Sequence, residues 1–368
     1  MIFLFKFTYQ QLLMTKKKTS LQVKIGVSQP ETTSKLSAEK IKINRLKQNS
    51  VADFVSKILE GNSTFLSRAI TLVESTNTRH QEKATKILEC CLPHANNSTR
   101  IGITGVPGVG KSTFIEAFGK HLTAQGKKVA VLAVDPSSSV NKGSILGDKT
   151  RMEQLVTDKN AFIRPSPSGN SLGGVAQKTR ESIILCEAAG FDTIIIETVG
   201  VGQSETVVHS MVDFFLLLKL AGAGDELQGI KRGIIEMADA IVINKADGEN
   251  EKNAKIAKIE FNRALHLYPI KESKWQPKVL TSSALYNIGI SEINSMIANY
   301  ISLTKENNFF QQKRSKQNTF WLLSSIEQQL KANFFQNPKI KKALSEEIKN
   351  IENGKTTPFN AAKRVLKL

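Results

Sequence analysis

The sequence predicts an α/β fold: a mostly parallel, doubly wound sheet with helical extensions before and after it. Between residues 100 and 304, short β-rich runs alternate with helical ones. The runs 129–134 and 193–196 are apolar without interruption, which is typical of parallel strands buried on both faces. Alternating strands and helices predict βαβ units that bind ligands at the carboxyl ends of the strands. We expect strands at 100–104, 128–134, 161–163, 193–197, 214–220, 240–243 and 278–280.

Composition and periodicity divide the chain into four segments. Residues 1–48 are rich in Lys, Ser, Thr and Gln without an apolar period, which predicts a flexible basic tail. Residues 49–99 predict a helical amino-terminal extension, because apolar residues recur at helical spacing until Pro93 ends the pattern. Residues 100–304 hold the expected sheet, and residues 305–368 predict a helical carboxyl-terminal extension.

The carboxyl-terminal extension carries an apolar stripe at helical spacing. The stripe consists of Leu323, Ile326, Leu330 and Phe334, with Trp321 alongside. Such a stripe either packs inside the chain or forms a contact with a second copy. Both interpretations stay open at this point, so the extension is a candidate dimerisation arm.

The composition favours a cytoplasmic protein without a membrane segment. No apolar stretch approaches the roughly 20 residues that a spanning helix needs. The opening residues 1–7 are apolar but short and lack a small-residue cleavage site, and Met14 is an equally good start. Three cysteines, among them the adjacent Cys90 and Cys91, form no disulfide framework, which suits a reducing compartment.

The net charge of +18 is concentrated near the two ends of the chain. Basic residues exceed acidic ones in residues 1–60 and 251–368, whereas residues 101–250 are close to neutral. No recognisable nucleic-acid-reading module accompanies the charge, so we expect no nucleic-acid partner. Solvated helix faces explain the lysines best, and an acidic protein partner is the second explanation.

The most informative motif follows the first expected strand and fits G-x-x-x-x-G-K-[ST]. Glycines allow a tight turn whose backbone N–H groups face an anion, and the next helix adds its positive dipole end. Lys111 can reach the β- and γ-phosphates, and the Ser112 hydroxyl can ligate Mg²⁺. The motif therefore predicts a P-loop NTPase. Its residues are Gly105, Val106, Pro107, Gly108, Val109, Gly110, Lys111, Ser112 and Thr113.

A second motif predicts that the base is guanine. Asn244, Lys245 and Asp247 fit N-K-x-D directly after an expected strand. The Asp247 carboxylate can accept two hydrogen bonds from guanine, whereas adenine would leave it unpaired at a cost of about 1–3 kcal/mol. The chain is thus predicted to bind GTP and GDP and to hydrolyse GTP. The loop of residues 282–285 after the last expected strand completes the predicted base site, because its backbone N–H groups can face guanine O6. The residues expected to contact the base are Ser283, Ala284 and Leu285.

Acidic residues at two other strand ends predict a magnesium site. Asp135 and Glu197 each end an expected strand, and with Ser112 they offer the oxygen ligands that Mg²⁺ prefers. Gly200 can sense the γ-phosphate through its N–H. Val201 stands where Ras-like enzymes place a water-orienting Gln, so we expect slow hydrolysis that a partner stimulates.

These motifs and their neighbours resemble the methylmalonyl-CoA mutase-associated GTPases, the MeaB/ArgK group of the SIMIBI-class P-loop GTPases. The resemblance covers roughly residues 50–335. It implies a Ras-like G domain with helical extensions, of which the carboxyl-terminal one is associated with homodimerisation. The stretches that carry it are 69–75, 101–113, 133–138, 143–152, 197–205, 222–231 and 244–247.

The resemblance also implies a role and a set of site residues. Such proteins protect an adenosylcobalamin-dependent acyl-CoA mutase and gate the loading of its cofactor with GTP. Lys111 would hold phosphate, and Arg151 would stabilise transferred charge. Asp225 and Lys231 would belong to a loop that faces the mutase. The magnesium set implied is Ser112, Asp135, Asp148 and Glu197.

Three other functions stay open on the sequence. The first is a P-loop ATPase or kinase of the same superfamily, against which the guanine-reading motif argues and which nucleotide preference would distinguish from a GTPase. The second is a GTP-binding switch for a different partner. The third is a module that holds GTP without hydrolysing it, which a turnover assay would reveal.

Overall fold

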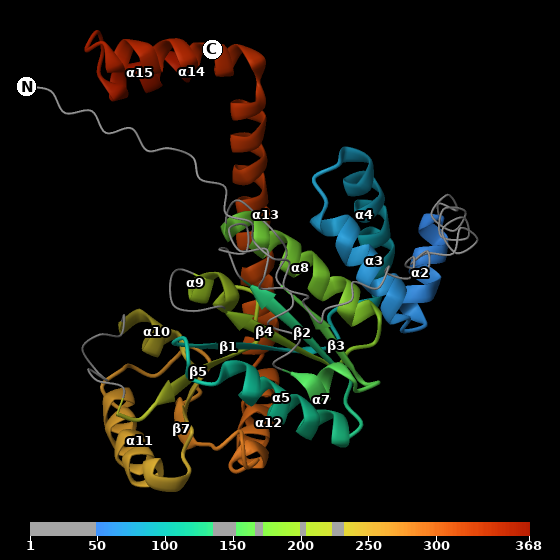
Figure 1. Ribbon diagram of the computed structural model, residues 1–368, viewed down its shortest axis with the longest axis vertical. Helices are drawn as coiled ribbons and strands as arrows, with labels where there is room; N and C mark the ends of the chain where they lie inside the picture. Colours follow the sequence, from blue (N-terminus) through green and yellow to red (C-terminus); the bar gives the residue numbers. More distant parts are fainter. Residues whose placement is uncertain (1–48, 135–151, 166–171, 199–203, 223–231) are drawn as a thin grey trace, which may run out of the picture. The chain divides into compact units, whose positions relative to one another are not determined.

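The computed structural model describes residues 49–134, 152–165, 172–198, 204–222 and 232–368. Among these residues, the chain from Ser50 onward forms one compact unit. Helices cover both faces of a central parallel sheet in this unit (Figure 1). The predicted α/β class with a doubly wound sheet is therefore confirmed, whereas the division into four segments stays a prediction.

The sheet has seven parallel strands in the order β3-β2-β4-β1-β5-β6-β7. Each expected strand is present, with ends that differ by at most one residue from those expected. β1 lies at the centre, where Ile103 pairs with Glu197 of β4 and Gly105 pairs with Leu218 of β5. The strands are β1 (Thr99–Gly105), β2 (Val129–Val134), β3 (Ala161–Arg164), β4 (Thr193–Thr198), β5 (Phe214–Leu220), β6 (Ala240–Asn244) and β7 (Lys278–Thr281).

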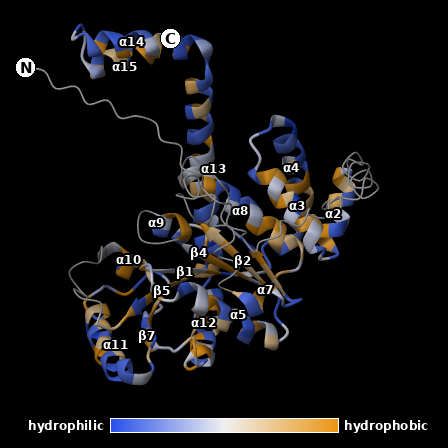
Figure 2. Cartoon of the chain, in the orientation of Figure 1, coloured by the Kyte–Doolittle hydropathy of each residue, from blue (hydrophilic) through white to orange (hydrophobic). Residues whose placement is uncertain are grey.

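Both faces of the sheet are buried, and Figure 2 shows that its strands are largely hydrophobic. Successive residues of a strand enter different core clusters, as Phe214 and Phe215 do, because strand side chains alternate between the faces. On one face lie α5 (Lys111–Ala124), α7 (Glu153–Val156) and α12 (Ile290–Glu306). On the other lie α8 (Leu172–Ala188), α9 (Ser204–His209), α10 (Arg232–Met237) and α11 (Glu251–Leu265).

Among the residues that the structure describes, three helices precede the sheet and add to the α8 face. They are α2 (Val51–Leu59), α3 (Ser63–Glu74) and α4 (Thr78–Cys91). α2 begins with a capping box, because Ser50 Oγ accepts from Asp53 N–H at 3.1 Å and the Asp53 carboxylate accepts from Ser50 N–H at 2.8 Å. Short 3₁₀ turns follow at η1 (Leu92–His94), where Pro93 lies, and later at η2 (Gly248–Asn250).

Three further helices follow α12 along the chain. They are α13 (Phe309–Gln336), α14 (Pro338–Glu352) and α15 (Pro358–Val365). α13 is 28 residues long, but polar and charged residues recur throughout it. None of the helices in the described ranges is both long enough and apolar enough to cross a membrane.

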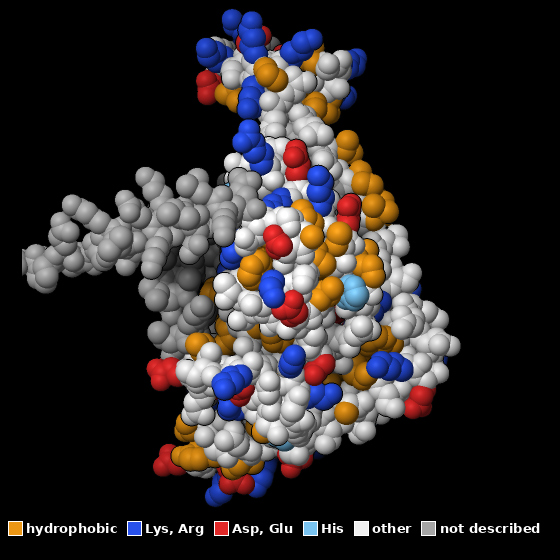
Figure 3. All heavy atoms as spheres, turned by 90° about the vertical axis from the view of Figure 1, so that its right-hand side faces the viewer, with side chains coloured by type: hydrophobic (Ala, Val, Ile, Leu, Met, Phe, Trp, Pro, Cys, Tyr) orange, Lys and Arg blue, Asp and Glu red, His pale blue; other side chains and the backbone are white. Residues whose placement is uncertain are grey.

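The apolar stripe of α13 does not pack inside the chain. Leu323, Ile326 and Leu330 are 57%, 47% and 64% exposed, and Phe334 is half-buried. Figure 3 shows hydrophobic side chains gathered along one edge of the exposed part of α13. Trp321, which lies beside the stripe in sequence, is buried. The interpretation of the stripe as intrachain core is therefore wrong, because the buried face of α13 is a different one.

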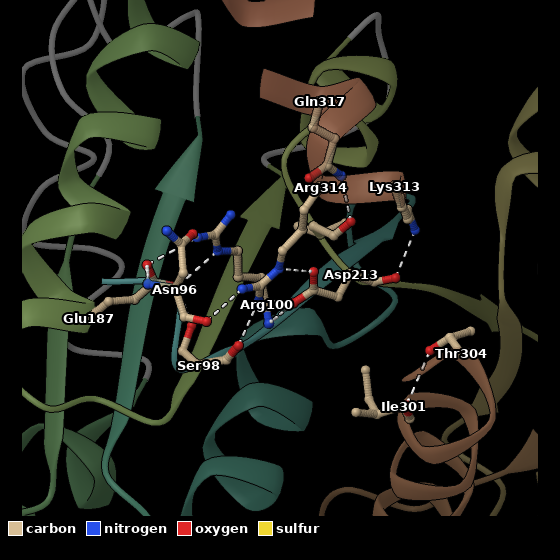
Figure 4. A network of polar contacts seen from close by, with 11 residues as sticks. Asn96, Ser98, Arg100, Glu187, Asp213, Ile301, Thr304, Lys313, Arg314 and Gln317 are labelled. Carbon is tan, nitrogen blue, oxygen red and sulfur yellow. Dashed lines mark hydrogen bonds and ion pairs between the residues drawn. The ribbon is translucent and has the colours of Figure 1, made fainter. Parts of the chain in front are cut away.

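Polar side chains attach the first half of α13 to the segment that leads into β5 (Figure 4). Arg314 Nε and Nη2 donate to the Asp213 carboxylate at 2.8 and 2.7 Å. Lys313 Nζ donates to the Asp213 carbonyl at 2.7 Å, and Gln317 Nε2 donates to the Val212 carbonyl at 2.9 Å. α13 is thus held at the amino-terminal edge of the sheet, opposite the strand ends that carry the motifs.

Candidate nucleotide site

The loop after β1 depends on two glycines for its course. Gly105 ends β1 so close to β5 that a Cβ there would lie 2.6 Å from the Leu218 carbonyl oxygen. Gly110 has a φ of +89°, and a Cβ there would lie 2.9 Å from Asn244 Nδ2. Side chains at these positions would push the loop away from β5 and β6. The glycine spacing therefore places the loop over the centre of the sheet.

Lys111 begins α5 and folds back over this loop. Its ammonium donates to the Gly105 carbonyl at 2.8 Å and to the Val106 carbonyl at 3.3 Å. The residue is 9% exposed. Burial lowers the pKa of Lys111, and the nearby Glu197 carboxylate raises it in part. A partly desolvated cation at the rim of an N–H-rich loop is suited to bind phosphate oxygens.

Two oxygen donors meet beside the start of α5. The Ser112 hydroxyl lies 3.5 Å from Glu197 Oε1, and Glu197 is 6% exposed near the end of β4. A hydroxyl and a carboxylate are hard ligands that fit the coordination Mg²⁺ prefers, with waters and phosphate oxygens completing the octahedron. Asp135 and Asp148, the other expected ligands, lie outside the described residues. In the described part of the chain, no group of three or more His, Cys, Asp and Glu side chains could hold a metal ion.

Asn244, at the end of β6, joins three loops. Its Nδ2 donates to the Val109 carbonyl of the phosphate loop at 2.9 Å, and its Oδ1 accepts from the Ser282 hydroxyl at 3.0 Å. Asn244 is 1% exposed, so both hydrogen bonds form away from water. The phosphate loop, the N-K-x-D loop and the loop after β7 are therefore fixed relative to one another.

The Asp247 carboxylate is oriented by the loop after β7. The Ser283 hydroxyl donates to Asp247 Oδ2, and Ala246 N–H donates to the Ser282 carbonyl at 2.9 Å. The Ser283 N–H is already bound to the Ile288 carbonyl at 3.0 Å. Of the three loop residues expected to face the base, Ala284 and Leu285 are therefore the better candidates to donate their N–H groups to guanine O6.

Comparison with known proteins identifies the family. The family model described as "Methylmalonyl Co-A mutase-associated GTPase MeaB" matches residues 66–339. The chain belongs to this family. It is therefore a P-loop GTPase, and its family name links it to methylmalonyl-CoA mutase.

Individual relatives of this MeaB-family chain cover most of its length. It is 46% identical over 313 residues to "GTPase ArgK" of Escherichia coli (strain K12), a match that covers 85% of this chain and 95% of the relative. It is 43% identical over 330 residues to "Methylmalonic aciduria type A homolog, mitochondrial" of Mus musculus, covering 87% and 80%. A solved structure described as "LAO/AO transport system kinase" is 40% identical, with a TM-score of 0.69 and coverage of 86% and 96%. The word kinase is part of that protein's description and is not a statement about this chain.

Several expected site residues of this MeaB-family GTPase fall outside the described ranges. They are Asp135, Asp148, Arg151, Gly200, Val201, Asp225 and Lys231. Ser282 belongs to the loop expected to face the base, but the sequence did not predict that its hydroxyl donates to Asn244. The available signal was the pair Ser282-Ser283 directly after β7, where one hydroxyl binds Asn244 and the other binds Asp247.

Proposed function

We propose that this MeaB-family GTPase is a chaperone that gates the loading of adenosylcobalamin into an acyl-CoA mutase and protects that enzyme. Methylmalonyl-CoA mutase is the first candidate partner, because the family description names it and the mouse relative is named for methylmalonic aciduria. The observation that carries the nucleotide part of the proposal is Asn244, whose side chain joins the phosphate loop to both base-reading loops.

In this proposal GTP lies across the carboxyl ends of the central strands. Backbone N–H groups of the loop from Gly105 to Gly110, except at Pro107, and of Thr113 would surround the phosphates, with Lys111 as their cation. Asp247 would accept from guanine, and Lys245, which has a φ of +57°, would lie along the base. Gly200 and Arg151 would act at the γ-phosphate. These residues bind and orient the nucleotide and stabilise charge, which is most of what phosphoryl transfer requires of a protein.

Magnesium belongs to the same proposal. Ser112 and Glu197 would hold it, with Asp135 and Asp148 contributing directly or through water. When bound, Mg²⁺ neutralises developing charge on the phosphates. The residue after Gly200 is Val201 and not Gln, which supports slow turnover by the protein alone and stimulation by a partner.

The exposed stripe of α13 supports a homodimer. Leu323, Ile326 and Leu330 present neighbouring apolar surfaces to solvent in a single chain. A second copy of the same stripe would bury them in an isologous contact.

A cytoplasmic location is part of the same proposal. The free cysteines Cys90, Cys91 and Cys186 are consistent with a reducing compartment.

The decisive experiment is GTP turnover by the purified protein with and without the adenosylcobalamin-dependent mutase of the same genome. We expect slow turnover alone and at least a severalfold rise with the mutase. Lys111→Ala is the matched control and should abolish both rates. An unchanged rate with the mutase would contradict the chaperone proposal and favour a switch for another partner.

The same assay tests the ATPase alternative. Substituting ATP for GTP should leave little turnover, because Asp247 finds no donor pair on adenine. Equal turnover of the two nucleotides would instead support a P-loop ATPase or kinase.

A further inference from the structure

Two threonine hydroxyls form a hydrogen bond between the central strands, one layer below the nucleotide site. Thr198 Oγ1, at the end of β4, donates to Thr104 Oγ1 of β1 at 2.9 Å. Thr198 is 0% and Thr104 1% exposed. No part of the proposed function uses either residue.

The pair faces away from the nucleotide. Strand side chains alternate, so Thr198 points to the opposite face of β4 from Glu197, whose carboxylate meets Ser112 on the α5 side. Thr104 shares its face with Gly102, where a Cβ would touch Val208 of α9. The hydroxyl pair therefore lies on the α8–α9 side of the sheet, on the opposite face from the contact between Ser112 and Glu197.

The surroundings of the pair are apolar. Neighbouring side chains on this face, such as Ile196 and Phe215, belong to the hydrophobic core. Replacing both partners of a buried hydrogen bond by apolar groups of the same shape can be nearly neutral or stabilising. Stability alone therefore gives no reason for two hydroxyls where two valines would fit. Unlike apolar contact, a hydrogen bond fixes the distance and angle between the two strand ends.

Each threonine adjoins a residue of the site. Thr104 precedes Gly105, whose carbonyl accepts from Lys111, and Thr198 follows Glu197. The hydrogen bond thus spans the two backbone positions from which the phosphate loop and the carboxylate are displayed. A shift of one strand end against the other would change the 3.5 Å separation of Ser112 Oγ and Glu197 Oε1.

We propose that Thr104 and Thr198 are positioning residues that fix the Glu197 carboxylate relative to the phosphate loop. The proposal rests on the assignment of Ser112 and Glu197 to magnesium. If so, the hydroxyl pair raises the affinity of the GTP-bound protein for Mg²⁺. It does not affect the affinity for GDP in the absence of metal.

Thr198→Val tests the proposal through the magnesium dependence of GTP turnover. The Mg²⁺ concentration for half-maximal turnover should rise about tenfold, the usual effect of losing a residue that orients a metal ligand. The affinity for GDP in EDTA should stay within about twofold of the parent, because the phosphate loop and the base reader are intact. Thr198→Ser keeps the hydroxyl and should restore the parental magnesium dependence.

Two further variants separate positioning from stability. Thr304→Val, on α12, removes an equally buried hydroxyl and should leave the magnesium dependence unchanged. This hydroxyl donates to the Tyr300 carbonyl at 2.8 Å and to the Ile301 carbonyl at 3.2 Å, of which Figure 4 shows the second. The double variant Thr104→Val/Thr198→Val leaves no hydroxyl unpaired, so it should fold as stably as the parent and still require more Mg²⁺.

A parental magnesium dependence in the folded double variant would overturn the proposal. Glu197→Gln distinguishes this failure from failure of the underlying metal assignment. If Glu197→Gln raises the Mg²⁺ requirement and the double variant does not, the threonine pair has no positioning role. If neither raises it, Glu197 is not a magnesium ligand, and the inference fails with that assignment.

Discussion

Among single residues, Asn244 explains best how separate motifs become one site. Its side chain donates to one loop and accepts from another, and it is buried between them. Losing this side chain would leave the Val109 carbonyl and the Ser282 hydroxyl without their partner. Each buried polar group left without a hydrogen-bond partner lowers the stability of the folded protein by about 1–3 kcal/mol. Asn244 therefore stabilises the loops as well as the site.

The proposed role of Asp247 gives a prediction about base preference. Asp247→Asn replaces a double acceptor by one acceptor and one donor, so GTP affinity should fall about 10- to 100-fold while xanthosine triphosphate gains. Competition binding with both nucleotides measures the change. Glu249→Gln, an exposed change in the same loop, is the matched control. Unchanged GTP affinity in Asp247→Asn would refute the assignment of Asp247.

His209 predicts a pH dependence of stability. Burial, together with the positive charge of Lys313, lowers the pKa of His209 from an ordinary 6.5 to about 4. Between these two pH values the unfolded chain binds more protons than the folded one, so stability must fall as the pH decreases from 6.5 to 4. Urea unfolding across this range should show a smaller loss in His209→Gln. His94→Gln removes an exposed imidazole and serves as the control.

The site residues differ in how far the sequence could predict them. The phosphate loop and the N-K-x-D loop were recognisable, because their chemistry requires fixed residue types at fixed spacing. The hydrogen-bond partners of Asn244 in the neighbouring loops were not, since Asn244 and Val109 are 135 residues apart and meet only after β6 and β1 enter the same sheet. Ser282 acquires its role in the same way, through the register of β6 and β7.

Among the elements, α13 departs most from its expected packing. The sequence pattern indicated that the apolar stripe packs either inside the chain or against a second copy. The face of α13 that packs inside the chain is a different one, which carries Arg314, Gln317 and Trp321. Arg314 is paired with Asp213, which lies 101 residues earlier. Hydropathy could not indicate such a face, because a buried arginine is tolerated only where a distant carboxylate and carbonyls receive it.

The attachment of α13 predicts unequal effects of two neighbouring substitutions. Arg314→Met leaves the buried Asp213 carboxylate without its cation and should destabilise the protein by about 3–5 kcal/mol. Lys316→Met, two residues on, breaks only an exposed ion pair with Glu272 and should cost about 0–1 kcal/mol. Denaturant midpoints of the two variants test the difference. Equal destabilisation would contradict the role given to the Arg314–Asp213 pair.

The strands were predicted more completely than the helices. Uninterrupted apolar runs such as Val129–Val134 are a direct consequence of burial on both faces, so each run coincides with a strand. The amino-terminal helical region resolves into three helices, two of which are preceded by the N-cap residues Asn62 and Asn77. These asparagines are local caps that apolar periodicity alone does not reveal.

At the scale of the whole molecule, the proposed dimer depends on the stripe of α13. Ile326→Glu should convert a dimer to a monomer, because a charge would be buried against its symmetry mate. Light scattering after size-exclusion chromatography measures the mass. Ile256→Glu, at a 56% exposed isoleucine of α11, is the control and should leave the mass unchanged. A monomeric parent protein would refute the dimer.

The central position of β1 also has a consequence for synthesis on the ribosome. β1 pairs with no strand that directly follows it, since its neighbours are β4 and β5. Until the nascent chain has been extended through Leu220, the phosphate loop has no completed sheet beneath it. The N-K-x-D loop emerges later still, so the growing chain acquires affinity for guanine only after β6 and β7 have been made. Such non-local pairing also predicts slow folding, during which chaperones can protect the exposed apolar strands.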